Sequence, residues 1–323
     1  MGVAWLFPGQ GSQVVGMGRD LYEASPAARR VLDLADQTLG VALTQLLFEG
    51  PAATLQLTIN AQPAIVAVSL AALAAYREAC GPAPDRALWP DFVAGHSVGE
   101  YAALVAAGAA DEATGLRLVR ERARLMHQAG QARPGSMMAI LGLELAAVEE
   151  ACRRARAQIP SSYVWVANHN LPAQVAIAGD PEGLALASKL CQEAGARRCV
   201  PLAVSAAFHS AAMEPVVAPL AAVLAAATIG DARVPLVANV SARPIQRAAA
   251  LREELAQQVA RPVRWADSLQ FLLDQGVRTF IEFGAGQVLT SMVQRLPAPD
   301  GELRALAVGD VPSAAHAAAL FAT

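Results

Sequence analysis

The sequence is poor in charge and has almost no lysine. Only 16% of its 323 residues are charged, the formal net charge is −3, and Lys189 is the single lysine. This balance gives no electrostatic basis for binding nucleic acid, which depends on clustered cations that neutralise phosphates. Lys189 is therefore the only side chain available for Schiff-base chemistry, and it lies in an ordinary amphipathic helical pattern. We therefore expect neither a nucleic-acid partner nor a catalytic lysine.

Cysteines are few and scattered. Cys80, Cys152, Cys191 and Cys199 show no C-x-x-C spacing and have no neighbouring pair of histidines. This pattern argues against a zinc site and provides no disulfide framework. We predict four free thiols and no metal.

Long uninterrupted apolar runs are also missing. Hydrophobic residues make up 54% of the chain, which excludes a disordered protein. However, no apolar run reaches the length needed to cross a bilayer without interruption by glycine, proline or a polar residue. The start, with apolar residues 3–7 and no basic region before them, predicts a core strand rather than a signal peptide. We expect a soluble cytoplasmic monomer without a membrane partner.

Short apolar runs alternate with helical patterns through most of the chain, which predicts an α/β fold with a parallel sheet covered by helices. Strands are predicted at 3–7, 92–96, 234–239 and 278–283. Helices are predicted near 26–40, 63–80, 100–108, 112–129, 213–227, 248–260, 267–275 and 287–296, with a helix or frayed end after 312.

The middle of the chain has a different order, strand-helix-strand-strand-helix-strand. Its strands are predicted at 137–143, 163–168, 174–178 and 198–204, its helices at 146–158 and 181–194, and its hairpin connection at 170–173. This order is typical of a small ferredoxin-like domain. We predict that residues 134–203 are inserted into a larger domain formed by 1–133 and 204–323.

The run Gly95-His96-Ser97-Val98-Gly99 has the form of a nucleophile elbow. A strand that turns into a helix at one residue holds that residue's side chain at the tip of a sheet, and flanking glycines let the backbone pass closely. A helix beginning at Val98 would direct its unpaired N–H groups toward an oxyanion. The alternative is that Ser97 only caps the helix.

His209 is the strongest candidate among five histidines for the base that activates Ser97. It lies in the loop 205–210, where the chain returns from the predicted insertion; a surface or capping histidine is the alternative. His96 points by strand alternation away from Ser97 and is expected to support the elbow. With no clearly placed acid, we predict a dyad in which a backbone carbonyl holds the histidine tautomer.

Arg122 falls within the apolar arc of the helix predicted at 112–129. An inward arginine is costly unless acceptors meet its planar fork. Three alternatives are open: an internal Asp or Glu pairs with Arg122, its guanidinium snorkels out to solvent, or it binds the carboxylate of a substrate.

The glycine-rich turn at 9–16 follows the first strand. Its spacing fits neither a dinucleotide fingerprint nor a P-loop. We expect instead that the backbone N–H of Gln10 faces the oxyanion from beside the elbow.

The sequence resembles the malonyl-CoA:acyl carrier protein transacylases over almost its whole length. The resemblance is carried by the strings LFPGQGSQ, GHSVGEYAALVAAG, RLVRERARLM, ANHNLPAQVAIAG, VSAAFHS, QQVARPVRW and EFGAGQVLTSMV. It implies an α/β-hydrolase-like domain with a ferredoxin-like insertion. It further implies Ser97 as the acylated nucleophile, His209 as general base and acid, the Gln10 and Val98 amides as the oxyanion hole, and Arg122 as the carboxylate clamp. Gln258 and Asn168 match family residues near the active site.

The activity that this resemblance implies is ping-pong transfer of malonyl from malonyl-CoA, through a malonyl-serine, to the phosphopantetheine thiol of acyl carrier protein for fatty-acid synthesis. No cofactor is implied, since the phosphopantetheine belongs to the partner. A discrete acyltransferase serving a polyketide synthase, or the transacylase of a malonate decarboxylase, would use the same residues. A thioesterase would share the elbow but should prefer an acidic third partner and has no need for Arg122.

Overall fold

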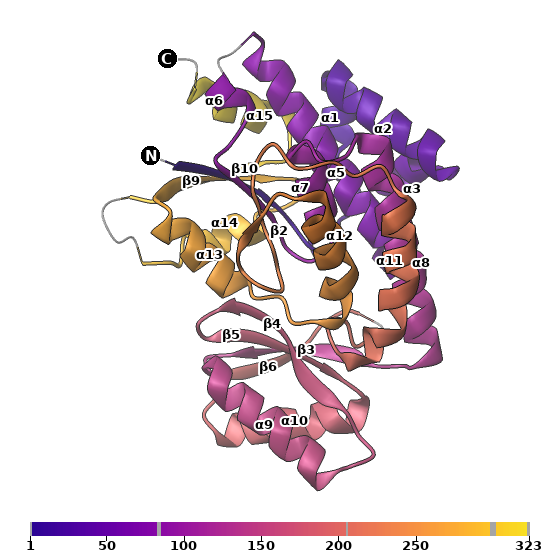
Figure 1. Cartoon of the computed structure of the whole chain (residues 1–323), viewed down its shortest axis with the longest axis vertical. Coiled ribbons are helices and arrows are strands. Elements are labelled where there is room, and N and C mark those ends of the chain that lie inside the picture. The colour runs from indigo at the N-terminus through magenta and orange to yellow at the C-terminus, as the bar shows by residue number, and fades with distance from the viewer. Residues whose placement is uncertain (1, 83–84, 205, 298–301, 322–323) are drawn as a thin grey trace.

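The protein is built around two separate sheets, seen in a computed structural model that describes residues 2–82, 85–204, 206–297 and 302–321 (Figure 1). The larger sheet has the strand order β10-β9-β1-β2-β7-β8. Its strands are β1 (Gly2–Phe7), β2 (Phe92–Gly95), β7 (Leu236–Val237), β8 (Pro244–Ile245), β9 (Val277–Phe283) and β10 (Arg304–Val308). All pairings are parallel except that of β7 with β8. The predicted α/β class is confirmed.

Helix α5 (Thr58–Cys80) is the central helix of this larger part, because it packs against α2 (Pro26–Leu39), α8 (Glu112–Ala132) and α15 (Val311–Ala319). It is long and apolar enough to cross a membrane, yet 83% of its most apolar window is buried inside the fold. A helix that is hydrophobic all round and covered on all sides is a core helix.

The other helices of the larger part pack against this sheet or against the helices that cover it. They are α1 (Arg19–Ala24), α3 (Leu43–Glu49), α4 (Ala52–Gln56), α6 (Asp85–Leu88), α7 (Gly99–Ala106), α11 (Glu214–Ala226), α12 (Ala248–Gln257), α13 (Trp265–Asp274) and α14 (Val288–Val293). Two short 3₁₀ turns, η1 (Ala211–Met213) and η2 (Gln258–Ala260), lie beside α11 and α12.

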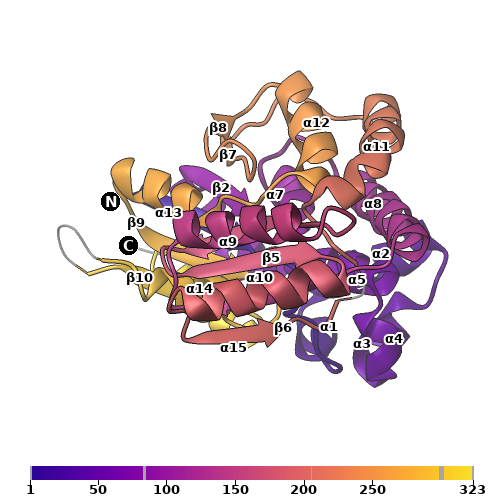
Figure 2. The same cartoon turned by 90° about the horizontal axis from the view of Figure 1, so that it is seen from below.

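The smaller sheet is antiparallel, with the strand order β4-β5-β3-β6. It is formed by β3 (Ser136–Leu141), β4 (Val164–Leu171), β5 (Gln174–Gly179) and β6 (Arg198–Pro201). Helices α9 (Leu145–Gln158) and α10 (Pro181–Glu193) cover its outer face, as the view from below shows (Figure 2). The predicted ferredoxin-like order of elements is confirmed.

Several predicted boundaries were wrong. The hairpin connection was predicted at 170–173, but β4 runs to Leu171 and β5 begins at Gln174, so only two residues connect them. β6 ends at Pro201 rather than at 204, and β7 keeps only two of the six residues predicted for it. The helix predicted at 248–260 ends at Gln257 and continues as a 3₁₀ turn. Elements α1, α3, α4, α6, β8 and β10 were not predicted, and the tail forms α15.

The two sheets meet where β4 passes the segment between η2 and α13. The amide of His169 donates to Val263 O at 2.8 Å, and the amide of Val263 donates to Ala167 O at 2.9 Å. Asn168 and Val263 form an isolated parallel bridge at this point. These backbone bonds hold the small sheet beside the carboxyl ends of β1 and β2, where parallel sheets place their ligand sites.

Candidate active site

Ser97 occupies the sharp turn between β2 and α7. Its φ of 52° lies in the left-handed region, which is uncommon for a residue other than glycine. A Cβ on Gly99 would lie 2.1 Å from Phe7 O, so the helix can approach β1 this closely only with glycine there. The helix begins at Gly99 rather than at Val98, which is the N-cap residue, and no side chain caps it. The alternative that Ser97 only caps this helix is therefore wrong.

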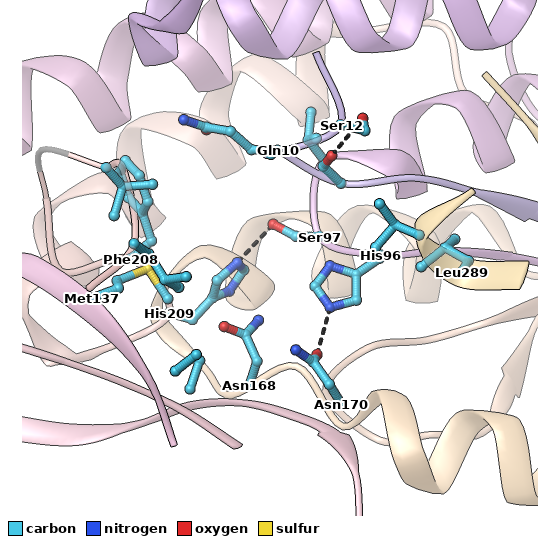
Figure 3. Close-up of a pocket in the computed structure, with 18 of the residues that line it drawn as sticks. Gln10, Ser12, His96, Ser97, Met137, Asn168, Asn170, Phe208, His209 and Leu289 are labelled. Carbon is cyan, nitrogen blue, oxygen red and sulfur yellow. Dashed lines mark hydrogen bonds between the residues drawn. The ribbon is translucent and has the colours of Figure 1, made fainter. Parts of the chain in front are cut away.

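His209 faces the Ser97 hydroxyl. Its Nε2 lies 2.7 Å from Ser97 Oγ (Figure 3). Its Nδ1 lies 2.7 Å from Gln258 O and 3.2 Å from Arg261 O. Since carbonyl oxygens only accept, Nδ1 carries the proton and Nε2 presents its lone pair to the serine O–H. Among the described residues no carboxylate bonds to this imidazole. Ser205, at the start of the predicted loop, lies outside the described residues.

The surroundings of His209 keep its imidazole neutral. Burial and the nearby charge of Arg122 lower its pKa to about 3, against the opposing effect of the Gln258 carbonyl. The backbone of His209 is also left-handed, with φ 57°. A neutral imidazole in a fixed tautomer can take up the Ser97 proton at once.

Arg122 lies on α8 with 1% of its surface exposed and reaches the same hydroxyl. Its NH2 donates to Ser97 Oγ at 3.0 Å and to Gln258 Oε1 at 2.7 Å, while NH1 donates to Gln62 Oε1 at 2.7 Å. The predicted inward direction of Arg122 is thus confirmed, and the snorkelling alternative is wrong.

No carboxylate among the described residues bonds directly to Arg122. Its side-chain acceptors are two neutral amides and a hydroxyl, and its Nε has no partner within the described part of the chain. Burial lowers the pKa of this guanidinium, although an arginine remains protonated at physiological pH. A buried cation without a direct counter-ion, next to a nucleophile, is suited to bind an anionic substrate group.

Two buried residues that hold the elbow were not predicted. Asn239, two residues after the end of β7, accepts from Ser97 N at 2.7 Å and donates from its side chain to Gly95 O at 2.7 Å. Glu100, in the first turn of α7, accepts from the amide of Asn239 at 2.8 Å. Asn239 is the last residue of the strand predicted at 234–239, and the carboxyl ends of parallel strands meet at one edge of a sheet. A polar residue at that end of a predicted strand was the available signal.

Gln62 and Gln258 fix Arg122 from opposite sides. Gln62, on α5, was not predicted, because a lone amide in an apolar helix carries no distinctive pattern. Gln258, predicted from the family resemblance, donates from Nε2 to Ser97 O at 2.9 Å and to Glu100 Oε2 at 2.6 Å. Both glutamines are buried.

The turn at residues 9–13 lies over the elbow and is braced by its own side chains. Ser12 Oγ donates to Gly9 O at 3.0 Å, and the amide of Gly11 donates to Gln13 Oε1 at 2.7 Å. Neither the amide of Gln10 nor that of Val98 has a hydrogen-bond partner among the described residues, and both residues line the pocket. These two N–H groups are free to meet an oxyanion.

His96 and Asn168 line the same pocket from the side of the small sheet (Figure 3). His96 Nε2 lies 2.9 Å from Asn170 Oδ1, and its ring packs edge-on against Trp265. Burial lowers the pKa of His96. Asn168 is buried in β4 and has the bridge to Val263 described above. His96 thus connects the elbow to the small sheet, as a supporting residue would.

The pocket is a cavity of about 260 Å³ whose walls come from both sheets. Apolar side chains from β3, β5 and α14 form one part of its lining: Met137, Ala139, Val175, Ala176, Leu289 and Met292. No cluster of metal-ligating side chains occurs within the described ranges. The arrangement can form and hold an acyl ester on Ser97 in a largely apolar space with one cation.

Comparison with known proteins gives a consistent result. Residues 4–311 match the family model described as an acyl transferase domain. The chain is 44% identical over 308 residues to the malonyl CoA-acyl carrier protein transacylase of Bacillus subtilis, covering 95% of this chain and 93% of that protein. It is 41% identical over 293 residues to the polyketide biosynthesis protein ThaF of Burkholderia thailandensis, covering 91% of this chain and 24% of that protein.

A solved structure is similar over the full chain. It is a malonyl-transacylase in complex with its type II PKS acyl-carrier protein, with a TM-score of 0.92 and 38% identity, covering 99% of this chain and all of that one. The family model, the near-complete coverage and the predicted elbow agree with one another. The chain therefore belongs to the family of malonyl CoA-acyl carrier protein transacylases, which are acyltransferases.

Proposed function

We propose that this enzyme transfers malonyl from malonyl-CoA to the phosphopantetheine thiol of an acyl carrier protein, supplying fatty-acid synthesis. The observation that carries this proposal is Arg122, a buried cation that bonds to no carboxylate in the described part of the chain and lies 3.0 Å from Ser97 Oγ. Only one methylene separates the malonyl carboxylate from its thioester carbonyl. A guanidinium this close to the nucleophile can hold that carboxylate while the ester forms.

In the first half of the reaction Ser97 Oγ attacks the thioester carbon and its proton passes to His209 Nε2. The oxyanion forms toward the amides of Gln10 and Val98. The C–S bond then breaks, and the imidazolium gives its proton to the departing CoA sulfur. The product is a malonyl ester on Ser97 and free CoA thiol.

In the second half the thiol of the carrier's phosphopantetheine gives its proton to His209 and attacks the same ester carbon. The C–O bond breaks, and Ser97 recovers its proton from the imidazolium. The carboxylate also compensates the charge of Arg122, which is one cause of the low pKa of His209. Malonyl binding thus raises the basicity of the imidazole in the complex that reacts.

The decisive test compares acyl groups on Arg122→Ala. We expect kcat/KM for malonyl-CoA to fall on the order of a hundredfold, about 3 kcal/mol, because charge-assisted bonds are lost. Acetyl-CoA, which has no carboxylate, should lose much less. Arg124→Ala, on an exposed face of the same helix, is the matched control. Equal losses for both acyl groups in Arg122→Ala would contradict the clamp.

Intact-mass measurement tests the nucleophile in the same experiment. Wild-type protein mixed with malonyl-CoA should gain one malonyl group, and Ser97→Ala should gain none. Slow hydrolysis of the wild-type adduct separates a transferase from the thioesterase alternative.

A second candidate is the same reaction serving a polyketide carrier. The similarity to a polyketide biosynthesis protein and to a transacylase solved with a type II PKS carrier favours it. Transfer rates to a fatty-acid carrier and to a polyketide carrier, measured side by side, distinguish the two pathways.

We further propose that the protein is a cytoplasmic monomer without cofactor, nucleic-acid partner or membrane association. Its net charge of −3 is in keeping with the lack of a nucleic-acid partner.

A further inference from the structure

A buried carboxyl group lies beneath the elbow and is not used in the proposed chemistry. Glu100 is fully buried, and no cationic side chain among the described residues bonds to it. The other buried acids have local structural partners. Glu282 accepts from the amides of Leu289 and Thr290 at the start of α14, and Glu254 accepts from the amide of Val240.

Both oxygens of Glu100 act as acceptors. Oε1 accepts from the amide of Asn239 at 2.8 Å, and Oε2 accepts from Gln258 Nε2 at 2.6 Å. The same Nε2 donates to Ser97 O at 2.9 Å. On its other side, Gln258 Oε1 accepts from Arg122 NH2 at 2.7 Å. The side-chain amide of Gln258 therefore lies between two acceptors and one cationic donor.

Only one orientation of this amide satisfies all of these contacts. Turned over, Gln258 would direct its oxygen at Glu100 Oε2 and Ser97 O, and its NH₂ group at the NH2 of Arg122. Acceptor would then face acceptor and donor would face donor. Of the two acceptors, the carboxyl group makes the stronger, charge-assisted bond.

We propose that Glu100 is a positioning residue that fixes the orientation of the Gln258 amide and, through it, the direction of Arg122 beside Ser97. Glu100 contacts neither the substrate nor the reacting atoms. This role rests on the proposed function of Arg122 as the malonyl clamp. It assigns Glu100 to acyl selection rather than to proton transfer.

Opposing effects act on the charge of Glu100. Burial and then the charge of Glu254, on α12, raise its pKa well above the ordinary value, whereas the bonds from Gln258 and Asn239 and the charge of Arg122 lower it. Protonation of Oε2 would place a donor against Gln258 Nε2 and remove the constraint. The carboxylate form is the one whose two oxygens both accept, as the geometry requires.

Glu100→Gln is the sharpest test because it is isosteric and changes one acceptor into a donor. The new NH₂ group favours the turned-over Gln258 amide, which then faces Arg122 with its own donors. We expect kcat/KM for malonyl-CoA to fall about tenfold or more, and kcat/KM for acetyl-CoA to change much less. Glu254→Gln, a neighbouring buried acid without a bond to Gln258, should keep the wild-type malonyl-to-acetyl ratio.

A double variant separates this role from a general structural one. In the Arg122→Ala background, Glu100→Gln should cause no further change in the malonyl-to-acetyl ratio, because the group it positions is gone. Equal loss for malonyl and acetyl, or an undiminished effect without Arg122, would overturn the proposal for Glu100. The proposed function fails separately, if Arg122→Ala alone leaves malonyl selectivity intact.

If Glu100→Gln does not fold, the wild-type enzyme provides a second measurement. With ¹⁵N-labelled glutamine, the side-chain NH₂ protons of Gln258 should exchange slowly with solvent and lie downfield of those of exposed glutamines, because Nε2 donates to Glu100 and to Ser97 O. Rapid exchange at the shifts of an exposed glutamine would show that Nε2 does not make these bonds, and would also overturn the proposal.

Discussion

Ser97 and His209 are both held in left-handed backbone conformations, with φ of 52° and 57°, and their side chains meet at 2.7 Å. Each such residue costs on the order of 1–3 kcal/mol and persists only where the surroundings over-determine it. Here Ser97 is held by the bond from its backbone N–H to the side-chain oxygen of Asn239. His209 is held by the contact of its Nδ1 with the backbone carbonyl of Gln258. At the scale of single residues, the site is rigid before any substrate arrives.

The low pKa of His209 predicts a stability that depends on pH. In the unfolded chain a histidine has a pKa of about 6.5, whereas burial and the charge of Arg122 lower that of His209 to about 3. Between these values the unfolded chain binds a proton that the folded protein does not. The free energy of unfolding should therefore fall as the pH falls from about 6.5, by at most about 1.4 kcal/mol per pH unit for this group.

Urea unfolding measured between about pH 7.5 and pH 5 checks this expectation. His209→Gln lacks the titrating group and should show a shallower decline than the wild type. His96, whose pKa is also lowered, contributes to both proteins and cancels in the comparison. Identical slopes would mean that folding does not lower the pKa of His209.

At the scale of elements, the turn from β2 to α7 has the least tolerance for added atoms. A Cβ on Gly99 would lie 2.1 Å from Phe7 O, which is backbone and cannot move aside. We expect Gly99→Ala to lower the free energy of unfolding by about 3 kcal/mol. Gly230→Ala is the matched control, because the nearest atom, Ala109 O, is 3.9 Å away; its stability should change by less than about 1 kcal/mol. Equal unfolding curves for the two variants would disprove the close approach.

How well the elements could be predicted depended on their length and periodicity. The long helix α8 and the core strand β1 have strong patterns and were predicted within a few residues. Helix α4 has five residues and no side-chain cap, and β10 is a largely half-exposed edge strand. Short elements of this kind form because the surrounding fold places them, so their own residues carry a weak signal.

The candidate site divides in the same way. Ser97 and Arg122 could be found from local patterns, since an elbow and an inward-facing arginine are visible in a single segment. Gln62, Glu100 and Asn239 could not, because their importance arises only where α5, α7 and the end of β7 meet. A buried polar residue becomes interpretable when its partners are known.

At the scale of the molecule, we propose that residues 134–203 form an inserted domain. The chain enters and leaves it side by side, because the amide of Leu202 donates to Met137 O at 3.0 Å. Its apolar core, around Ile140, Val148 and Ile177, is separate from the cores of the larger part. The cavity beside Ser97 is lined by residues of both sheets.

The backbone bonds at this junction predict slow amide exchange. His169 N and Val263 N both donate across the boundary between the two sheets. If the parts behave as one unit, these amide hydrogens should exchange as slowly as those within the small sheet, such as Ala139 in β3. Hydrogen exchange followed by NMR measures both. Much faster exchange at His169 and Val263 would show that the two parts open independently.

The left-handed backbone at Ser97 and His209 affects which variants of this protein directed evolution would select. Glycine adopts this conformation without penalty. An inactive variant with glycine in place of Ser97 or His209 therefore avoids the backbone strain energy that the active enzyme has at that position. Screening a library for thermal stability alone would therefore enrich inactive variants. Engineering this scaffold for robustness therefore requires that turnover be scored in every round.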